Sequence, residues 1–420
     1  MSFFDILAAY CFGYPFVMSF YWMAGGVLFY WLRERKEPPP GRPPPLADYP
    51  PVSILVPCHN EERQLAETFA ALAGVDYPEF EIIAINDGST DRTGPMLDTL
   101  AGRIPRLRIV HLATNQGKST ALNAGALAAR HELLVCIDGD ALLDPHAVTW
   151  FVRRFQSDPA LGALTGNPRI RNRATLLGRL QVGEFSSILG LIKRAQSVYG
   201  QLFTISGVVC AFRKRALQGG GWWASDAITD DVNVSWRIQL TGWRIAFVPQ
   251  ALCWILMPET LRGLWRQRLR WSEGGTQTML KAFPYLWEPR SRWRLIPVWV
   301  NYMAAVLWSY AMLLATLVWS LQLGSRLLGY EGLPDWPGFS PIPGAWGSLL
   351  GLTYLLQALL SMLIDQRNER GLLRSLFWIV WYPVVFWALQ AATAIVGLPR
   401  AALRAPPKLG TWTSPDRGLQ

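Results

Sequence analysis

The chain has 420 residues and a formal net charge of +10; 51% of its residues are hydrophobic and only 17% are charged. Soluble globular proteins average about 25% charged residues, so the composition excludes a purely soluble, a disordered or a fibrous protein. Nucleic acid is not the expected partner of the basic surplus, because Lys and Arg beside apolar spans commonly follow the positive-inside rule or meet anionic lipid. Five cysteines without metal-ligand spacing fit a reducing compartment for the soluble part.

Four stretches without Asp, Glu, Lys or Arg are long enough to cross a bilayer, which takes roughly 20 apolar residues. They are residues 6–32, 295–325, 336–364 and 375–399. The first lacks a basic N-terminal region and an A-x-A cleavage site, so it is expected to be a retained anchor and not a signal peptide. For any one stretch, the alternative is a buried core helix.

The charged flanks predict the orientation of these stretches. The basic run at 33–36 and the Arg-containing loop at 365–374 are expected in the cytoplasm, because positive residues are retained on that side. Two crossings between them put residues 326–336 outside. A single crossing by 375–399 would export the basic tail at 400–420, against the rule, so the side of that tail stays open.

Composition divides the chain into five parts. They are an N-terminal membrane anchor (1–36), a Pro-rich linker (37–51), a cytoplasmic α/β domain with interfacial helices (52–284), a C-terminal transmembrane region (295–399) and a basic tail (400–420). Within the α/β domain, residues 176–195 are amphipathic and include the polar Arg179, Lys193 and Arg194. This segment either lies along the bilayer surface or is an ordinary helix packed on the soluble domain.

The soluble part alternates short apolar, β-branched runs with segments of helical periodicity. Asn60 is expected to cap the first helix, and Asp144 followed by Pro145 to open a later one. This rhythm predicts a doubly wound, mainly parallel α/β sheet, in which ligands bind at the carboxyl ends of the strands. Strands are expected at 52–56, 82–85, 108–112 and 133–137, and an Ala-rich helix at 118–130.

Polar residues follow three of these strands. His59, Asn60 and Glu61 follow the first strand, Asp87 the second, and Asp138-Gly139-Asp140 the strand at 133–137. Two carboxylates held together at a strand end repel each other unless a cation neutralises them, and Mg²⁺ shared with a diphosphate is a natural occupant. The alternative is a turn with an N-capping Asp.

The other candidates have equally open interpretations. Asp87 fits either a ribose- or base-binding carboxylate or a helix cap. Lys118, after Gly117 at a helix start, fits either a phosphate site or a solvated surface Lys. Of the adjacent Asp230 and Asp231, one could cap the following helix and the other act as a general base.

Gln267, Arg270 and Trp271 lie in a stretch rich in Arg and Trp. A basic amphipathic helix on the membrane surface accounts for that pattern. A planar guanidinium also suits a leaving diphosphate, and an indole face suits a sugar ring. Arg262, Arg266 and Arg268 could contact an anionic ligand, but lipid headgroups account for them equally well.

The order and spacing of these motifs between membrane spans resemble the processive family-two glycosyltransferases, which include cellulose, hyaluronan and chitin synthases. Longer stretches resemble more closely the bacterial poly-β-1,6-N-acetyl-D-glucosamine synthase family (PgaC/IcaA type). These stretches are VPCHNEE, NDGSTD, NQGKSTALNAG, LVCIDGDALLD, TGNPRIR, QVGEFSSILGLIKR, ALCWILMPET, LWRQRLRW and the terminal SPDRG.

The resemblance implies a GT-A domain embedded between transmembrane helices, with its site on the cytoplasmic face of a bacterial inner membrane. By the matching motifs, Asp87 would hold the uridine of a UDP-sugar, beside the turn that contains Pro57, Asn60 and Glu61. Lys118 would join this nucleotide-sugar site. The middle residue of the family's T-E-D triplet is most often Glu, whereas this chain has Asp230.

The resemblance also assigns the reacting groups. Asp138 would support the diphosphate, and Asp140 would bind Mg²⁺ or Mn²⁺. Asp231 would be the base that deprotonates the acceptor hydroxyl in an inverting, single-displacement transfer. A last set would bind the acceptor end and the leaving UDP: Gln267, Arg270 and Trp271.

The implied substrates are UDP-N-acetylglucosamine and the growing polysaccharide, in contact with the lipid bilayer. A small membrane subunit of the PgaD type, with cyclic di-GMP regulation, is implied by the resemblance alone. Three alternatives stay open: another processive synthase of the hyaluronan, chitin or cellulose type, a transferase that moves one sugar to a polyprenyl phosphate, and a non-catalytic pore or receptor subunit. The last is disfavoured because Asp140, Asp231 and Arg270 are all present.

Overall fold

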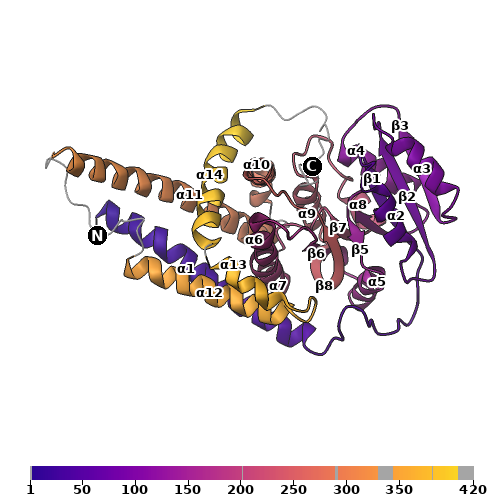
Figure 1. Cartoon of the computed structure of the whole chain (residues 1–420), viewed down its shortest axis with the longest axis horizontal. Coiled ribbons are helices and arrows are strands. Elements are labelled where there is room, and N and C mark those ends of the chain that lie inside the picture. Colours follow the sequence, from indigo (N-terminus) through magenta and orange to yellow (C-terminus); the bar gives the residue numbers. More distant parts are fainter. Residues whose placement is uncertain (1, 201, 289–291, 330–343, 381, 405–420) are drawn as a thin grey trace.

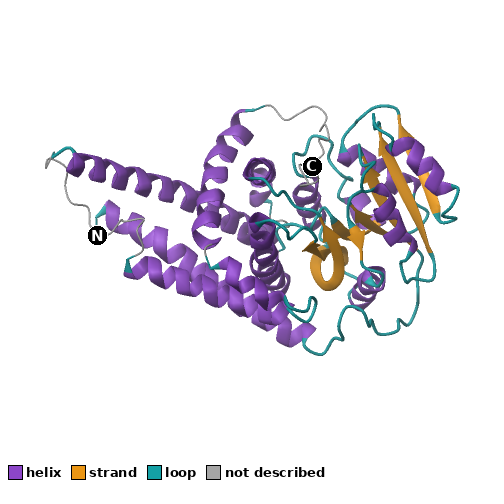
Figure 2. Cartoon of the chain, in the orientation of Figure 1, coloured by secondary structure: helices purple, strands orange, loops and turns teal. Residues whose placement is uncertain are grey.

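A computed structural model of the chain describes residues 2–200, 202–288, 292–329, 344–380 and 382–404. Its strands gather at one end, and long helices extend from the other end (Figures 1 and 2). The segment at 330–343, which contains most of the region expected outside the membrane (326–336) and the start of the third predicted stretch, lies beyond the described residues. So does most of the basic tail, with the terminal SPDRG stretch.

The sheet of the described residues has the strand order β3-β2-β1-β4-β7-β6-β8-β5. Its first four strands pair in parallel, β7 runs antiparallel between β4 and β6, and β8 is parallel to β6. The predicted doubly wound, mainly parallel sheet is therefore confirmed. The strands are β1 (Val52–Cys58), β2 (Phe80–Asp87), β3 (Leu107–Leu112), β4 (Leu133–Ile137), β5 (Leu142–Leu143), β6 (Leu161–Ile170), β7 (Val209–Arg213) and β8 (Arg244–Ile255).

The central strands are apolar throughout because helices cover both faces of the sheet. On β1, Ile54 packs in the cluster that contains Phe69 of α2, whereas the neighbouring Leu55 packs in the cluster that contains Ala121 of α4. The helices of this domain are α2 (Leu65–Ala73), α3 (Thr93–Ala101), α4 (Lys118–Ala128), α5 (Ala147–Ser157), α8 (Lys214–Gly219) and α9 (Asp230–Leu240).

Two of the expected helix starts are wrong. Asn60 does not cap α2: it has a left-handed backbone with φ of 55°, and the helix begins five residues later at Leu65. Asp144 does not open α5 directly, since its Oδ1 accepts from the amide of His146 and the helix begins at Ala147. In both places the side chain forms hydrogen bonds within a turn and not with the first amides of the helix, as Asn and Asp side chains often do.

Among the described residues, four helices are long and apolar enough to cross a membrane, which indicates a membrane protein. The fourth predicted stretch is divided, because the short α13 (Leu376–Ile379) precedes the long final helix. The four spanning helices are α1 (Phe3–Phe29), which continues as a π-helical turn (Tyr30–Glu34), α11 (Arg292–Leu327), α12 (Ala345–Asp365) and α14 (Tyr382–Leu403).

Three further helices join these spans to the sheet. They are α6 (Leu176–Glu184), α7 (Leu191–Tyr199), which follows a π-helical segment (Phe185–Gly190), and α10 (Leu261–Ala282). Helix α7 packs on α1, and α10 packs on α14. The α1–α7 approach needs glycine, because a Cβ on Gly26 would lie 2.2 Å from Leu191 Cδ1 and one on Gly25 would lie 2.6 Å from Ala195 Cβ.

The Pro-rich segment before β1 is tied along α5. Trp150 Nε1 donates to Pro40 O at 2.8 Å, and Gln156 Nε2 donates to Asp48 O at 2.8 Å. A guanidinium of the same helix, that of Arg153, pairs with Glu37. The segment thus connects α1 to the sheet along a fixed route.

Candidate active site

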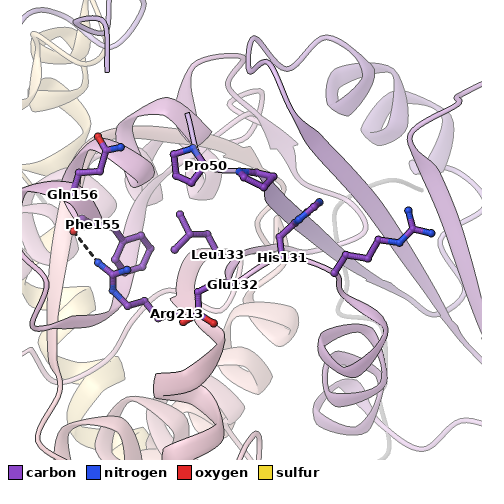
Figure 3. Close-up of a pocket in the computed structure, with 9 residues that line it drawn as sticks. Pro50, His131, Glu132, Leu133, Phe155, Gln156 and Arg213 are labelled. Carbon is purple, nitrogen blue, oxygen red and sulfur yellow. Dashed lines mark hydrogen bonds between the residues drawn. The ribbon is translucent and has the colours of Figure 1, made fainter. Parts of the chain in front are cut away.

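A cavity of about 350 Å³ opens at the amino ends of β1 and β4 (Figure 3). Pro50, His131 and Phe155 line it, and Arg213 Nη2 beside it is already bonded to Phe155 O at 2.9 Å. Ligands of doubly wound sheets bind at the opposite, carboxyl ends of the strands. We therefore place the candidate site at that other edge, where the polar residues identified from sequence lie.

Asp87, at the end of β2, is fully buried and holds the turn that precedes α4. Its two oxygens accept from the amides of Gln116 and Gly117, both at 2.8 Å. Gly117 has φ of 87°, which favours glycine at that position. Because a carboxylate can accept about four hydrogen bonds, Asp87 retains capacity for a further donor.

His59 braces the same turn from the end of β1. Its Nδ1 lies 2.8 Å from Asp87 O, and its Nε2 lies 3.1 Å from Asn115 Nδ2. The carbonyl must accept, so Nδ1 carries the proton and Nε2 accepts from the amide groups. Sequence analysis had noted His59 without giving it a part in the site.

The turn after β1 is locked to the turn after β2. Asn60 donates its amide to Ser89 Oγ at 3.1 Å and accepts from Thr90 N at 2.9 Å. The buried Glu61 donates its amide to Thr93 Oγ1 at 2.8 Å. Pro57 pairs with β2, and its carbonyl would lie 3.1 Å from a Cβ on Gly139, so this turn also abuts the Asp138–Asp140 turn.

Lys118 follows the turn that Asp87 holds and contacts the carboxylates of Asp138 and Asp230. Its Nζ donates to Asp138 Oδ1 and to Gly207 O, at 2.5 and 3.1 Å, and lies 4.0 Å from Asp230 Oδ2. Burial disfavours the charged ammonium, but the surrounding carboxylates outweigh that cost and raise the pKa of Lys118. The side chain is a partly buried cation held by carboxylates, with 19% of its surface exposed, which disagrees with the solvated-lysine interpretation.

Asp140 lies in a region of clustered negative charge. Asp140 is 8% exposed and lies two residues after Asp138, which directly follows β4. Burial, and then the charges of Asp138, Asp140 and Asp144, raise the pKa of the nearby Cys253 thiol. Among the residues that the structure describes, no group of three His, Cys, Asp or Glu side chains forms a complete metal cage.

Asp231 lies at the start of α9, after Thr229, which is the N-cap without a side-chain cap bond. Its Oδ2 accepts from the amide of Gly207 at 3.3 Å. Burial and the charge of Asp230 raise the pKa of Asp231, against the opposing charges of Lys118 and Arg270. A carboxylate with a raised pKa in a partly open site suits general-base chemistry.

Helix α10 brings the Gln267–Trp271 motif beside this carboxylate. Arg270 is exposed and within electrostatic reach of Asp231. Gln267 Oε1 is buried without a hydrogen-bond partner among the described residues, and its Nε2 lies 3.9 Å from Met257 Sδ. An unpaired buried amide oxygen of this kind is free to accept a hydrogen bond from a ligand or water.

Arg268 packs on the indole of Trp271, with its Cζ 4.3 Å from the centroid of the ring. Arg268 is buried and paired with Glu184 at 2.9 Å, so it is not available to lipid headgroups. Arg262 and Arg266 remain exposed. The motif therefore combines exposed cations with an internally supported indole.

The structure brings Lys118, Asp138, Asp230 and Asp231 into one group, with Arg270 facing it. Three further groups beside the site were not predicted from the sequence: the turn at 205–207, Thr165 of β6 and Lys193 of α7. Two of them lie within stretches that carried the family resemblance, TGNPRIR and QVGEFSSILGLIKR. Their spatial relation could not be inferred from that.

The family model described as "Glycosyltransferase like family 2" matches residues 50–274. This match covers more than half of the chain and contains every candidate site residue. The chain belongs to glycosyltransferase family 2 and is an enzyme of that class.

More specific relatives match almost the full length. The chain is 36% identical to the poly-β-1,6-N-acetyl-D-glucosamine synthase of Staphylococcus aureus (strain COL), over 100% of this chain and 99% of the relative. It is 36% identical to the protein of the same name from Staphylococcus epidermidis, over 96% and 97%. The resemblance that the sequence motifs indicated is therefore confirmed, and these synthases are the chain's family within the larger class.

A solved structure has the same fold. The mannosyltransferase PcManGT from Pyrobaculum calidifontis, in complex with GDP-Man and Mn²⁺, superposes with a TM-score of 0.61. The match covers 94% of this chain and 99% of that chain at 21% identity. It supports the expected GT-A architecture of the domain between the membrane helices.

Proposed function

We propose that this protein polymerises N-acetylglucosamine from UDP-N-acetylglucosamine into β-1,6-linked poly-N-acetylglucosamine, a biofilm exopolysaccharide, as a processive, inverting glycosyltransferase. The observation that carries the proposal is the grouping of Lys118, Asp138 and Asp231 at the carboxyl edge of the sheet, with Arg270 on a helix that packs on a membrane span. Donor, base and acceptor groups would thus meet beside the bilayer through which the polymer leaves.

The nucleotide would bind at the turns after β1 and β2. Asp87 would accept a hydrogen bond from the uracil with its remaining lone pairs, while the backbone amides keep it fixed. Pro57, Asn60 and Glu61 would form the neighbouring wall. At the start of α4, Lys118 and the helix amides would face the diphosphate.

The carboxylates at this edge fit a divalent ion, Mg²⁺ or Mn²⁺, whose coordination would be completed by the substrate. Mg²⁺ usually takes one or two protein carboxylates together with phosphate oxygens, so an incomplete protein cage is the expected arrangement. Asp140 would hold the ion in the negative region that it shares with Asp138 and Asp144. When bound, the ion would neutralise charge on the leaving diphosphate.

The transfer step needs one proton acceptor. The acceptor 6-hydroxyl would attack the anomeric carbon of the donor sugar on the face opposite UDP, forming the new C–O bond as the bond to the diphosphate breaks. Asp231 would take the hydroxyl proton, and Arg270 would stabilise charge on the departing UDP. Because the displacement is single, the anomeric configuration inverts and no covalent enzyme intermediate forms.

The acceptor end of the polymer would lie along α10. The exposed guanidinium of Arg270 and the unpaired oxygen of Gln267 offer it hydrogen bonds. Trp271 offers an indole face held in place by Arg268. These groups would bind the last sugar and the leaving nucleotide together.

The membrane helices would place this site on the cytoplasmic side of a bacterial inner membrane and aid export of the polymer. Arg367 donates to the backbone oxygens of Glu34 and Glu37, so the ends of α1 and α12 lie together beside the catalytic domain. That contact supports the same side for residues 33–36 and 365–374, as the positive-inside rule predicts. The chain would accordingly consist of a membrane anchor (1–36), a linker (37–51), the cytoplasmic GT-A domain (52–284), a C-terminal transmembrane region (295–399) and a basic tail (400–420).

Partners follow from the family and remain proposals. They are UDP-N-acetylglucosamine, the growing polysaccharide, the bilayer and a small PgaD-type subunit with cyclic di-GMP regulation; nucleic acid is not among them. Other processive synthases and polyprenyl-phosphate sugar transferases share the nucleotide half of such a site. The match to curated synthases over the full length favours the first assignment.

One experiment separates these functions. Membranes containing the protein and its small subunit are incubated with Mg²⁺ and, in parallel, UDP-N-acetylglucosamine, UDP-glucose and UDP-glucuronate. The expected product is a long polymer from UDP-N-acetylglucosamine alone, with β-1,6 linkages by NMR. A single-sugar lipid product, or a polymer from another donor, would overturn the proposal.

A further inference from the structure

Lys193, on α7, is a buried cation beside the candidate site. Its residue is 7% exposed, and its Nζ donates to Thr165 Oγ1 at 3.2 Å. Within the described ranges, no carboxylate lies at ion-pair distance from this ammonium. Burying a cation against a single neutral hydroxyl is costly, so the arrangement calls for an explanation beyond packing.

Thr165 links this lysine to the turn at 205–207. Its Oγ1 also accepts from the amide of Ser206 at 2.8 Å. The next residue, Gly207, donates its amide to Asp231 Oδ2 at 3.3 Å and accepts from Lys118 Nζ at 3.1 Å. One hydroxyl thus connects Lys193 with the peptide that touches Asp231.

The turn has little freedom once these bonds are formed. Ile205 donates its amide to Ser235 Oγ at 2.9 Å, and that hydroxyl donates to Asp231 O at 2.6 Å. A Cβ on Gly207 would lie 3.3 Å from both Cβ and Oδ2 of Asp231. A shift of the turn by a few tenths of an ångström would therefore be transmitted directly to the Asp231 carboxylate.

Four charged groups influence that carboxylate, each from a different position. Asp230 precedes it on α9, Lys118 comes from α4, Arg270 from α10 and Lys193 from α7. Burial lowers the pKa of Lys193 to about 8, while the charge of Asp231 opposes that shift. At neutral pH the lysine is therefore mainly charged.

We propose that Lys193 is a positioning residue for the acceptor-activating carboxylate. Through Thr165 it holds the 205–207 turn against Asp231, and its ammonium adds a buried positive charge that favours the ionised form of that carboxylate. The proposal deepens the proposed function, since it rests on Asp231 acting as the base.

The central test is the pH dependence of kcat for Lys193→Met, Lys193→Arg and the wild type. Loss of the ammonium should lower kcat about tenfold. It should also move the acidic limb of the kcat–pH profile, where activity falls as Asp231 is protonated, to higher pH by about half a unit or more, because a nearby cation lowers a carboxyl pKa. The arginine variant keeps the charge, and its limb should stay near the wild-type position. Lys214→Met is the matched control: Lys214 donates to Ala129 O away from the site, and its profile should not change.

Thr165→Val and Thr165→Ser test the hydroxyl link without touching the lysine. The valine variant should lose at least about fivefold in kcat with little change in KM for the donor, and serine should restore most of it. These substitutions also decide the matter if Lys193→Met fails to fold. An unchanged kcat in Thr165→Val overturns the link, and an acidic limb unmoved in folded Lys193→Met overturns the electrostatic role.

Asp231→Asn distinguishes a failure of the Lys193 proposal from a failure of the proposed role of Asp231 as the base. If Asp231→Asn keeps wild-type turnover, the base assignment itself fails. If it loses turnover while Lys193→Met and Thr165→Val behave as wild type, only the role of Lys193 is overturned.

Discussion

Adjacent residues of α7 belong to two charge clusters, one partly buried and one buried, that differ in how completely the charges are paired. Lys193 belongs to the site cluster, with Lys118, Asp138, Asp230 and Asp231. Arg194 belongs to the junction cluster, with Glu34 of the π-helical turn that continues α1, Asp365 of α12 and their neighbours Arg169, Arg173 and Glu369.

Every guanidinium of the junction cluster lies within 3 Å of a carboxylate. Arg194 contacts Glu34 and Asp365, both at 2.8 Å, and Arg169 contacts Asp365 at 2.6 Å. Burial alone would lower the pKa of Arg194, but these two carboxylates raise it above its ordinary value. The cluster joins the ends of two membrane helices to β6 and α7.

In the site cluster, by contrast, most of the charged groups lack a close ion-pair partner. Only Lys118 and Asp138 are in close contact, while Asp231 has a raised pKa and Lys193 a lowered one. Full pairing fixes protonation and serves structure, whereas partial pairing leaves groups able to exchange protons or receive a charged ligand. The two clusters should therefore respond differently to substitution.

The largest effect is expected for Asp140→Ala, which removes the proposed metal ligand. Sugar transfer should be abolished, and UDP binding in Mg²⁺ should weaken, while the protein stays folded and membrane-inserted. Transfer assays and calorimetric titration with UDP would measure both. Asp98→Ala, an exposed carboxylate that pairs with His111, is the control and should retain activity. Full activity of Asp140→Ala in Mg²⁺ would remove the assignment.

Asp231→Asn tests the base. The amide keeps the size of the side chain but cannot accept a proton, so kcat should fall by roughly 10²–10⁴-fold or more. UDP-sugar binding should change little, because those contacts belong to Asp87, Asp140 and their neighbours. Single-turnover kinetics and a binding assay distinguish the two quantities. Loss of UDP binding at an unchanged saturated rate would make Asp231 a nucleotide or metal ligand and Asp230 the candidate base.

Arg194→Met tests the junction cluster. It leaves Glu34 buried without its ion-pair partner and leaves Asp365 with Arg169 alone; breaking a buried pair typically costs about 3–5 kcal/mol. The melting temperature in detergent should fall steeply, while the pH profile of the remaining folded enzyme should keep its acidic limb. Arg215→Met breaks an exposed pair with Glu132 and should cost at most about 1 kcal/mol. A shifted acidic limb in Arg194→Met would show that the two clusters are not separate in function.

Sequence patterns were sufficient where structure is local. The expected strand at 133–137 coincides with β4, since a fully apolar run between turn residues has few other solutions. The motifs also indicated the family, and the structure brings the predicted site residues Lys118, Asp138 and Asp231 together. Helix starts at Asn60 and Asp144 were misplaced because these side chains bonded to nearby turns instead.

The two charge clusters were beyond sequence analysis for a physical reason. Residues 176–195 could have lain on the bilayer surface, but Lys193 and Arg194 are buried, which supports a packed helix at that point. The partners of Arg194 lie 160 and 171 residues away along the chain. No periodicity or spacing reports contacts of that kind, and a Lys-Arg pair in a helix is ordinarily read as a solvated face.

Asp230→Asn should give the smallest effect and the sharpest comparison. A raised pKa means that Asp231 keeps its proton to a higher pH than an ordinary Asp, so transfer is lost as the pH falls through that raised value. Since the charge of Asp230 contributes to the shift, its removal should lower the pKa of Asp231 and move the acidic limb of kcat to lower pH.

This shift is opposite in sign to that expected for Lys193→Met. The acidic limbs of the two variants should therefore lie on either side of the wild-type limb. Asp226→Asn is the matched control, because Asp226 pairs with Lys281 at 2.6 Å outside the site cluster and its loss should leave the limb in place. If Asp230→Asn and Lys193→Met move the limb in the same direction, the limb does not report the ionisation of Asp231. The proton acceptor would then have to be sought among other groups at the carboxyl edge of the sheet.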